Sequence, residues 1–157
     1  MRHGVRLGVD VGTARIGLAR CDSRGMLATP VETVQRDRRG AAVDVTRIAA
    51  VCRELEAIEI IVGLPLALSG SHTASTADAT GFAESLQRVV PVPVRLVDER
   101  LSTVTAQSAL RSSGKKAKAH RPVIDQVAAV IILQHALDTE RASGKPPGSA
   151  VNPNEGS

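Results

Sequence analysis

Apolar and polar residues alternate along the first 35 residues with the period of β-strands. Every second residue of the opening segment is apolar, namely Val5, Leu7, Val9 and Val11. The same period predicts two further strands, over residues 16–21 and 26–34, each joined to its predecessor by a short turn. Pro30 cannot donate a hydrogen bond to a neighbouring strand, so we expect the third strand at an edge of the sheet. The chain should therefore open with three antiparallel strands.

From residue 41 onward, apolar residues recur at helical spacing in segments that alternate with short buried strands. The pattern predicts helices over 41–56 and about 79–90, and strands over 58–62 and 94–98. Ser102 or Thr103 caps a predicted short helix that extends to about Ser112, and Pro122 begins a final helix that is apolar on nearly all sides.

This order of elements predicts an α/β domain over residues 1–141, with a mixed five-stranded sheet and helices on both faces. The first strand is expected at its centre, beside the strand that ends at Val62. Residues 142–157 are rich in Pro, Gly and Ser, so we expect them to form a disordered C-terminal tail.

Composition narrows the choice of partner and compartment. The chain has a net charge of +4 and a sequence pI of about 9.7, but one Phe and no Trp or Tyr. The scarcity of aromatic residues excludes proteins that read single strands by stacking, so a nucleic acid would be bound through its phosphates. The two cysteines fit no metal or disulfide spacing, no apolar run is long enough to span a membrane, and no signal peptide is evident. We expect a cytoplasmic protein that does not contact membranes.

Three acidic sites fall where this architecture could bring them together. Asp10 ends the predicted central strand, Asp98 and Glu99 end the last strand, and Asp125 lies in the first turn of the final helix. Each has an ordinary alternative role: Asp10 in its own turn, Asp98 and Glu99 in an ion pair with Arg100, and Asp125 at a helix N-terminus. Together they predict a cluster of oxygen ligands for Mg²⁺ or Mn²⁺, which can activate water for phosphodiester cleavage.

Basic residues gather close to these acids. Between Arg95 and Arg121, seven basic residues stand against two acidic ones, an excess that is larger than the net charge of the whole chain. The candidate phosphate contacts are Thr13, Arg15, Arg100, Lys115, Lys116, Lys118 and Arg121. For Thr13 and Arg15 the alternative is an ordinary turn, and for the lysines it is a solvated loop.

Four motifs occur in a fixed order: Val9-Asp10-Val11-Gly12 with Arg15-Ile16-Gly17, Gly63-Leu64-Pro65 with Gly70, Asp98-Glu99-Arg100-Leu101-Ser102-Thr103, and Asp125-Gln126-Val127-Ala128-Ala129. Over residues 5–138 the chain resembles the YqgF family, also called RuvX, of bacterial RNase H-like nucleases. The resemblance implies an RNase H-like fold and a metal-dependent nuclease with Asp10, Glu99 and Asp125 as catalytic metal ligands. It implies a supporting role for Asp98.

The resemblance also implies two tasks: maturation of the 5′ end of 16S rRNA from its precursor, and resolution of Holliday junctions. We favour an endonuclease that acts on precursor 16S rRNA. Junction resolution requires two symmetric cuts and therefore a homodimer, whereas the sequence is compatible with a monomer or a homodimer. A kinase of the actin-like fold also begins with Asp-x-Gly-Thr but needs a second domain. A nucleic-acid-binding factor without catalysis would explain the basic residues but not three converging acids.

Overall fold

The structure is a computed structural model that describes residues 1–101 and 121–151. Its strands and helices follow one another in the order β1 (Arg6–Val11), β2 (Arg15–Cys21), β3 (Ala28–Gln35), α1 (Val43–Glu54), β4 (Glu59–Leu64), α2 (Ala74–Gln87), β5 (Val94–Asp98), the 3₁₀ turn η1 (Glu99–Leu101), α5 (Arg121–Ser143) and β6 (Ser149–Ala150). The short helix predicted over about 102–112 lies outside the described residues.

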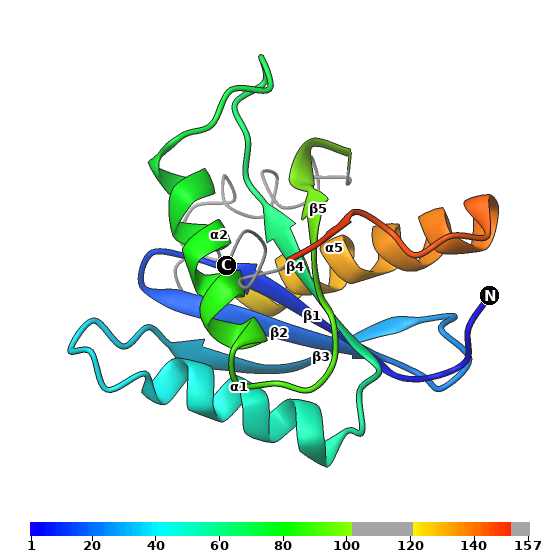
Figure 1. Ribbon diagram of the computed structural model, residues 1–157, viewed down its shortest axis with the longest axis horizontal. Helices are drawn as coiled ribbons and strands as arrows, with labels where there is room; N and C mark the ends of the chain where they lie inside the picture. Colours follow the sequence, from blue (N-terminus) through cyan, green and yellow to red (C-terminus); the bar gives the residue numbers. More distant parts are fainter. Residues whose placement is uncertain (102–120, 152–157) are drawn as a thin grey trace.

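The strands form one mixed sheet in the order β3-β2-β1-β4-β5-β6 (Figure 1). β1 and β2, and β2 and β3, pair antiparallel, while β1, β4 and β5 run parallel to one another. The predicted central place of β1 beside β4 and the predicted edge position of β3 are both confirmed. The pairing of β2 with β3 shifts between Leu18 and Ala19, where Pro30 stands opposite, because proline has no N–H for the ladder.

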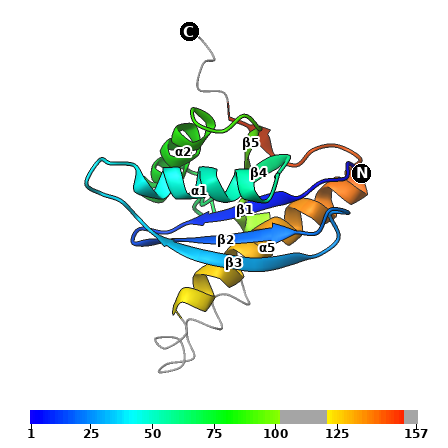
Figure 2. The same cartoon turned by 90° about the horizontal axis from the view of Figure 1, so that it is seen from below.

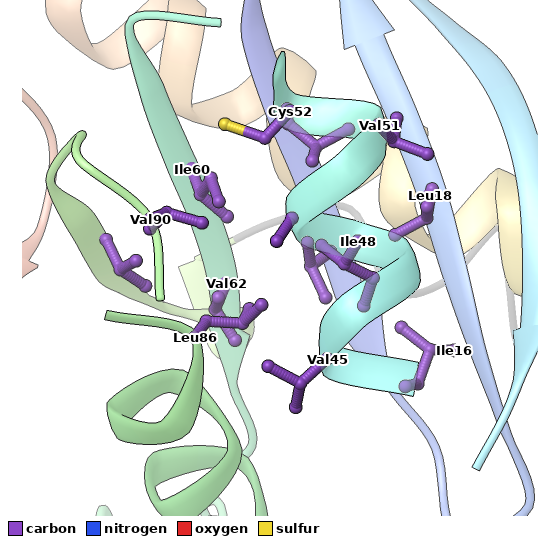
Figure 3. Close-up of a cluster of buried hydrophobic side chains, with 14 of the residues drawn as sticks. Ile16, Leu18, Val45, Ile48, Val51, Cys52, Ile60, Val62, Leu86 and Val90 are labelled. Carbon is purple, nitrogen blue, oxygen red and sulfur yellow. The ribbon is translucent and has the colours of Figure 1, made fainter. Parts of the chain in front are cut away.

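Helices α1 and α2 cover one face of the sheet and α5 covers the other, as Figure 2 shows. The first face holds a core in which apolar side chains of β1, β2, β4 and α1 interlock with those of α2 (Figure 3). Ile16, Leu18, Ile48, Ile60 and Val62 in this core are each fully buried. The valine and leucine positions of the opening alternation therefore face α1 and α2, and the intervening positions of β1 face α5.

Helix α5 lies against β1, β2, β3 and β4 and approaches the sheet closely where the strands carry glycine. A Cβ on Gly8 would stand 2.8 Å from the Cβ of Leu133, and one on Gly17 would overlap the backbone carbonyl of Asp125. These two glycines therefore set how closely the first half of the helix packs, and the site described below depends on that approach.

The sheet has six strands instead of the five predicted, because β6 pairs antiparallel with the outer edge of β5. The pairing places Ala150 opposite Arg95, and the Val151 N–H donates to the Val94 carbonyl at 2.7 Å. The predicted disordered tail is therefore wrong for residues 142–151, which complete α5 and then fill the free hydrogen bonds of β5. Residues 152–157 lie outside the described residues.

A buried ionic cluster, which the sequence reasoning missed, lies beside the start of β1. The side chain of Arg6 is 1% exposed and its Nη2 lies 3.0 Å from Oε2 of Glu140 in α5. Arg2 bridges Glu140 and Glu59 at 2.6 and 3.1 Å, and Arg95 lies 2.8 Å from Glu59. Charges this deeply buried are costly unless paired, so the cluster ties α5 to β1, β4 and β5.

Cys21 and Cys52 are both buried and carry free thiols. No helix in residues 1–101 or 121–151 is long and apolar enough to cross a membrane.

Candidate active site

A cavity of about 440 Å³ opens at the end of the sheet where β1 finishes. Asp10, Glu99 and Asp125, the three acids singled out from the sequence, all line it. They come from three separate elements: the end of β1, the start of η1 after β5, and the first turns of α5. The fold thus brings residues that are up to 115 positions apart in the chain to one cavity at the end of the sheet, where ligands bind in open α/β sheets.

Two glycines explain how these acids come so close to the sheet. Asp10 is paired in register with Gly17 on β2, so the two residues share one face of the sheet. Because Gly17 has no side chain, the backbone of Asp125 lies directly over it. Gly63, near the end of β4, has the same effect for Glu99: a Cβ there would lie 2.6 Å from Oε1 of that carboxylate. Both glycines belong to the sequence motifs described above.

Two of the acids near the site, Asp125 and Asp98, are paired with arginines. Asp125 accepts a 2.7 Å hydrogen bond at Oδ2 from Nε of Arg15, and both side chains are less than a third exposed. Asp98 does not line the cavity; Arg100 grips both of its carboxylate oxygens, with Nη2 2.6 Å from Oδ2. The hydrogen bonds from Arg100 hold the pKa of Asp98 below its usual value. The ion pair weighed as the ordinary role of Asp98 is therefore present.

The donor set at the cavity consists of carboxylate oxygens, which are the ligands that Mg²⁺ and Mn²⁺ prefer. In the part of the chain that the structure describes, no three His, Cys, Asp or Glu side chains stand close enough together to hold a metal ion. The predicted cluster of metal ligands is therefore not assembled among the described residues, and the Arg15 guanidinium occupies Oδ2 of Asp125. A metal ion at Oδ2 of Asp125 would compete with Arg15.

Only some of the predicted phosphate contacts lie at the cavity in the part of the chain that the structure describes. Thr13 is exposed and, with Arg15, lines the cavity, whereas Arg100 is committed to Asp98 and to the Leu68 carbonyl at 3.2 Å. Lys115, Lys116 and Lys118 lie outside the described residues. Arg121 is the first residue of α5, one residue before the predicted start, and its side chain is not described.

The sequence reasoning missed one charged residue at the cavity, Asp78 of α2. Its carboxylate accepts two hydrogen bonds from Arg36, at 2.8 and 2.9 Å. The Arg36 guanidinium carbon also lies 5.2 Å from the centroid of the Phe82 ring. Asp78 belongs to no recognised motif. The one signal in the sequence was its position directly before Ala79, which the helical pattern places on the apolar face of this helix.

Comparison with protein families gives a match over residues 4–139 to the family described as "RuvX: Holliday junction resolvase". Among curated relatives, a protein of Leifsonia xyli subsp. xyli is 66% identical over 99% of both chains, and it is named "Putative pre-16S rRNA nuclease". A protein of Streptomyces coelicolor with the same name is 55% identical over 96% of this chain and 90% of its own.

Among solved structures, the fold is similar to that of RuvC from Thermus thermophilus in complex with a Holliday junction substrate. The TM-score is 0.55 at 21% sequence identity, with 92% of this chain and 99% of that chain covered. A second Thermus thermophilus RuvC structure gives a TM-score of 0.53 at 19% identity, over 94% of this chain and 98% of that one. These likenesses confirm the RNase H-like fold.

Proposed function

Because this chain belongs to the RuvX family of Holliday junction resolvases and the carboxylates of Asp10, Glu99 and Asp125 line one of its cavities, we propose that it is a metal-dependent endonuclease. The observation that carries the proposal is the convergence of Asp10, Glu99 and Asp125 from three elements. An acidic residue with a purely structural role does not require two further carboxylates beside it. Phosphodiester cleavage by metal ions does require several carboxylates that converge on one site. A binding factor without catalysis gains nothing from three carboxylates that repel phosphate, and a kinase of the actin-like fold does not agree with the family.

We assign Asp10, Glu99 and Asp125 as the ligands of Mg²⁺ or Mn²⁺. When bound, the metal supplies activation of a water molecule and stabilisation of the leaving oxygen. The chain's own residues orient the reaction: β1 fixes Asp10, and the space left by Gly63 admits the Glu99 side chain. Arg15 neutralises Asp125, and it would be free to contact a phosphate if that carboxylate held a metal ion.

Precursor 16S rRNA is the substrate we favour, with cleavage at the 5′ end of the mature sequence. Support comes from the names of relatives that are 55–66% identical over nearly the whole chain. Such a nuclease would act in the cytoplasm. Resolution of branched DNA by a homodimer is the second candidate, and the name of the family favours it.

The nucleic acid would be bound through its phosphates. The proposed contacts are Thr13 and Arg15 at the cavity, Arg100 once it leaves Asp98, and the basic residues Lys115, Lys116, Lys118 and Arg121. Since one aromatic residue occurs in the whole chain, recognition should depend on shape and charge more than on base sequence.

The test is cleavage by the wild type and by Asp10→Asn, with Mn²⁺ or Mg²⁺, of a precursor 16S 5′ fragment and of a four-way DNA junction. The amide has the shape of the carboxylate, so the variant should fold normally and lose most of its cleavage activity. Asp138→Asn, an exposed change on α5 whose side chain is 58% accessible, is the matched control and should cleave like the wild type. Wild-type rates in Asp10→Asn at saturating metal would rule out Asp10 as a ligand. If the wild type cleaves the four-way DNA junction in preference to the precursor fragment, branched DNA becomes the proposed substrate instead of precursor rRNA.

A further inference from the structure

The turn between β1 and β2 has all three of its successive backbone carbonyls occupied by residues that follow β3. The carbonyl of Gly12 accepts a 2.9 Å hydrogen bond from Nη1 of Arg36, and that of Ala14 accepts a 3.0 Å bond from the Arg36 backbone N–H. The carbonyl of Thr13 accepts a 2.9 Å bond from Nη2 of Arg38. A segment that would otherwise be an exposed hairpin turn is therefore clamped from one side.

One carboxylate, Asp78, fixes the two arginines that form this clamp. Its oxygens lie 2.8 and 2.9 Å from the two terminal nitrogens of Arg36, and Oδ2 lies 3.8 Å from Nη2 of Arg38. The Arg36 side chain is 8% exposed, with the Phe82 ring against it and Oδ2 of Asp44 3.6 Å from Nε. Since a guanidinium buried this deeply needs a charged partner, the orientation of Arg36 depends on Asp78.

The clamped turn connects the strand that carries Asp10 to Arg15, the residue that pairs with Asp125. Asp78 itself lines the same cavity as these residues. A shift of the turn would therefore move both the end of β1 and the partner of Asp125.

We propose that Asp78 is a positioning residue for the nuclease reaction, acting through Arg36 and Arg38 to hold the β1–β2 turn in the geometry that the acids require. This inference rests on the proposed function. It assigns Asp78 no contact with metal or substrate, so its loss should impair the rate of the chemical step more than substrate binding. Removal of the carboxylate leaves Arg36 without its main partner and releases the carbonyl of Gly12.

The test compares Asp78→Asn with the wild type in the full chain. We expect kcat to fall by about 10- to 100-fold with KM changed by less than about threefold, because a small displacement of catalytic groups has effects of that size. Hydrogen exchange, measured without metal or substrate, gives a second readout. The Gly12 amide, which donates to the Arg15 carbonyl at 2.9 Å, should exchange about tenfold faster or more, as expected for loss of a charge-assisted hydrogen bond.

Glu32→Gln is the matched control, because Glu32 makes an equally good two-point pair with Arg47, at 2.9 and 2.7 Å, in a solvent-exposed contact between β3 and α1. It should leave kcat and the exchange of the Gly12 amide unchanged. Wild-type kcat or wild-type exchange in Asp78→Asn would overturn the proposal, as would equal changes in the control.

Two further readouts keep the proposal open to refutation. If Asp78→Asn does not fold, Arg38→Ala replaces it, since that side chain is 57% exposed and contributes one of the turn bonds. It should raise the exchange rate of the Gly12 amide by about two- to tenfold, and an unchanged rate would overturn the clamp. If the wild type cleaves no nucleic acid, the proposed function fails, while the exchange measurement still decides whether Asp78 holds the turn.

Discussion

Gly17 is the position where one methyl group would test how α5 is seated on the sheet. A Cβ there would overlap the backbone carbonyl oxygen of Asp125 and lie 3.0 Å from the backbone nitrogen of Gln126. Backbone atoms cannot rotate away as the end of a side chain can, so β2 or the first turns of α5 must move by about 1 Å to restore normal contact distances. Overpacking of this kind in Gly17→Ala should lower the free energy of unfolding by about 1–3 kcal/mol.

The same displacement should affect activity more strongly than stability. Whether β2 or α5 moves, Asp125 shifts relative to the strand that faces it, and a misplacement of about 1 Å in the proposed catalytic group reduces rates by about 100-fold. Urea unfolding followed by circular dichroism measures the first effect. Cleavage of precursor rRNA at saturating Mn²⁺ measures the second.

Gly81→Ala is the matched control for this prediction. Gly81 lies inside α2, and a Cβ there would have nothing within 4 Å. Alanine in a helix interior should raise the free energy of unfolding by about 0.5–1 kcal/mol and leave cleavage unchanged. If Gly17→Ala unfolds at the same urea concentration as the wild type and cleaves at the wild-type rate, the close approach of α5 does not depend on the missing side chain, and the reasoning is refuted.

Three other predictions follow from the charges. Arg15→Ala should raise the affinity for Mn²⁺ by about two- to fivefold, because Asp125 loses a competing ion pair of about 0.5–1 kcal/mol. The same variant should bind substrate more weakly. Metal affinity is measured by calorimetry, and a lower affinity than that of the wild type would contradict the prediction. Glu140→Gln should lower the free energy of unfolding at pH 7 by about 3–5 kcal/mol, because buried Arg6 loses its partner. Burial alone would raise the pKa of Glu140, but hydrogen bonds from Arg2 bring it below its usual value of 4.5, so this contribution exists above about pH 4.5 and is lost as the pH falls through the folded-state pKa. The difference between the variant and the wild type should therefore shrink in acid, and a difference independent of pH would contradict the pairing. Replacing Lys115, Lys116 and Lys118 with alanine should leave the free energy of unfolding within about 0.5 kcal/mol of the wild-type value. In salt titrations, the slope of log binding constant against log salt concentration should be smaller by roughly two to three units. An unchanged slope would mean that these residues do not touch the substrate.

The sequence was sufficient for the elements that bury one face against the core. Strand β1 and helix α1 were found within two residues of their ends, because burial imposes periods of 2 and 3.6 on apolar residues. Strand β6 could not be found in this way, since its two residues pair through backbone groups and carry no apolar pattern. Its formation depends on the free edge of β5, which is a property of the whole sheet.

The candidate site likewise contains residues that the sequence could predict and residues that it could not. Asp10, Glu99 and Asp125 could be chosen because strand ends and a first helical turn meet at one edge of the sheet. Arg6 and Asp78 could not, because their partners are distant in the sequence. Arg6 occupies a polar position in the alternation of β1, yet that face is covered by α5, and the carboxylate that compensates it lies 134 residues away.

The position of α5 has a consequence for the order in which the protein becomes active during synthesis. The ribosome releases β1 to β5 first, and the helix that carries Asp125 follows at about 5–20 residues per second. Until it docks, Ala19, Ile61 and Val97 on that face of the sheet lack their apolar cover, and the cavity lacks one of its four acids, Asp125. A nascent chain is therefore exposed to aggregation until its last helix emerges, and under the proposed role of Asp125 it would also be inactive as a nuclease. Cleavage near the translating ribosome would then be confined to chains that have completed their fold.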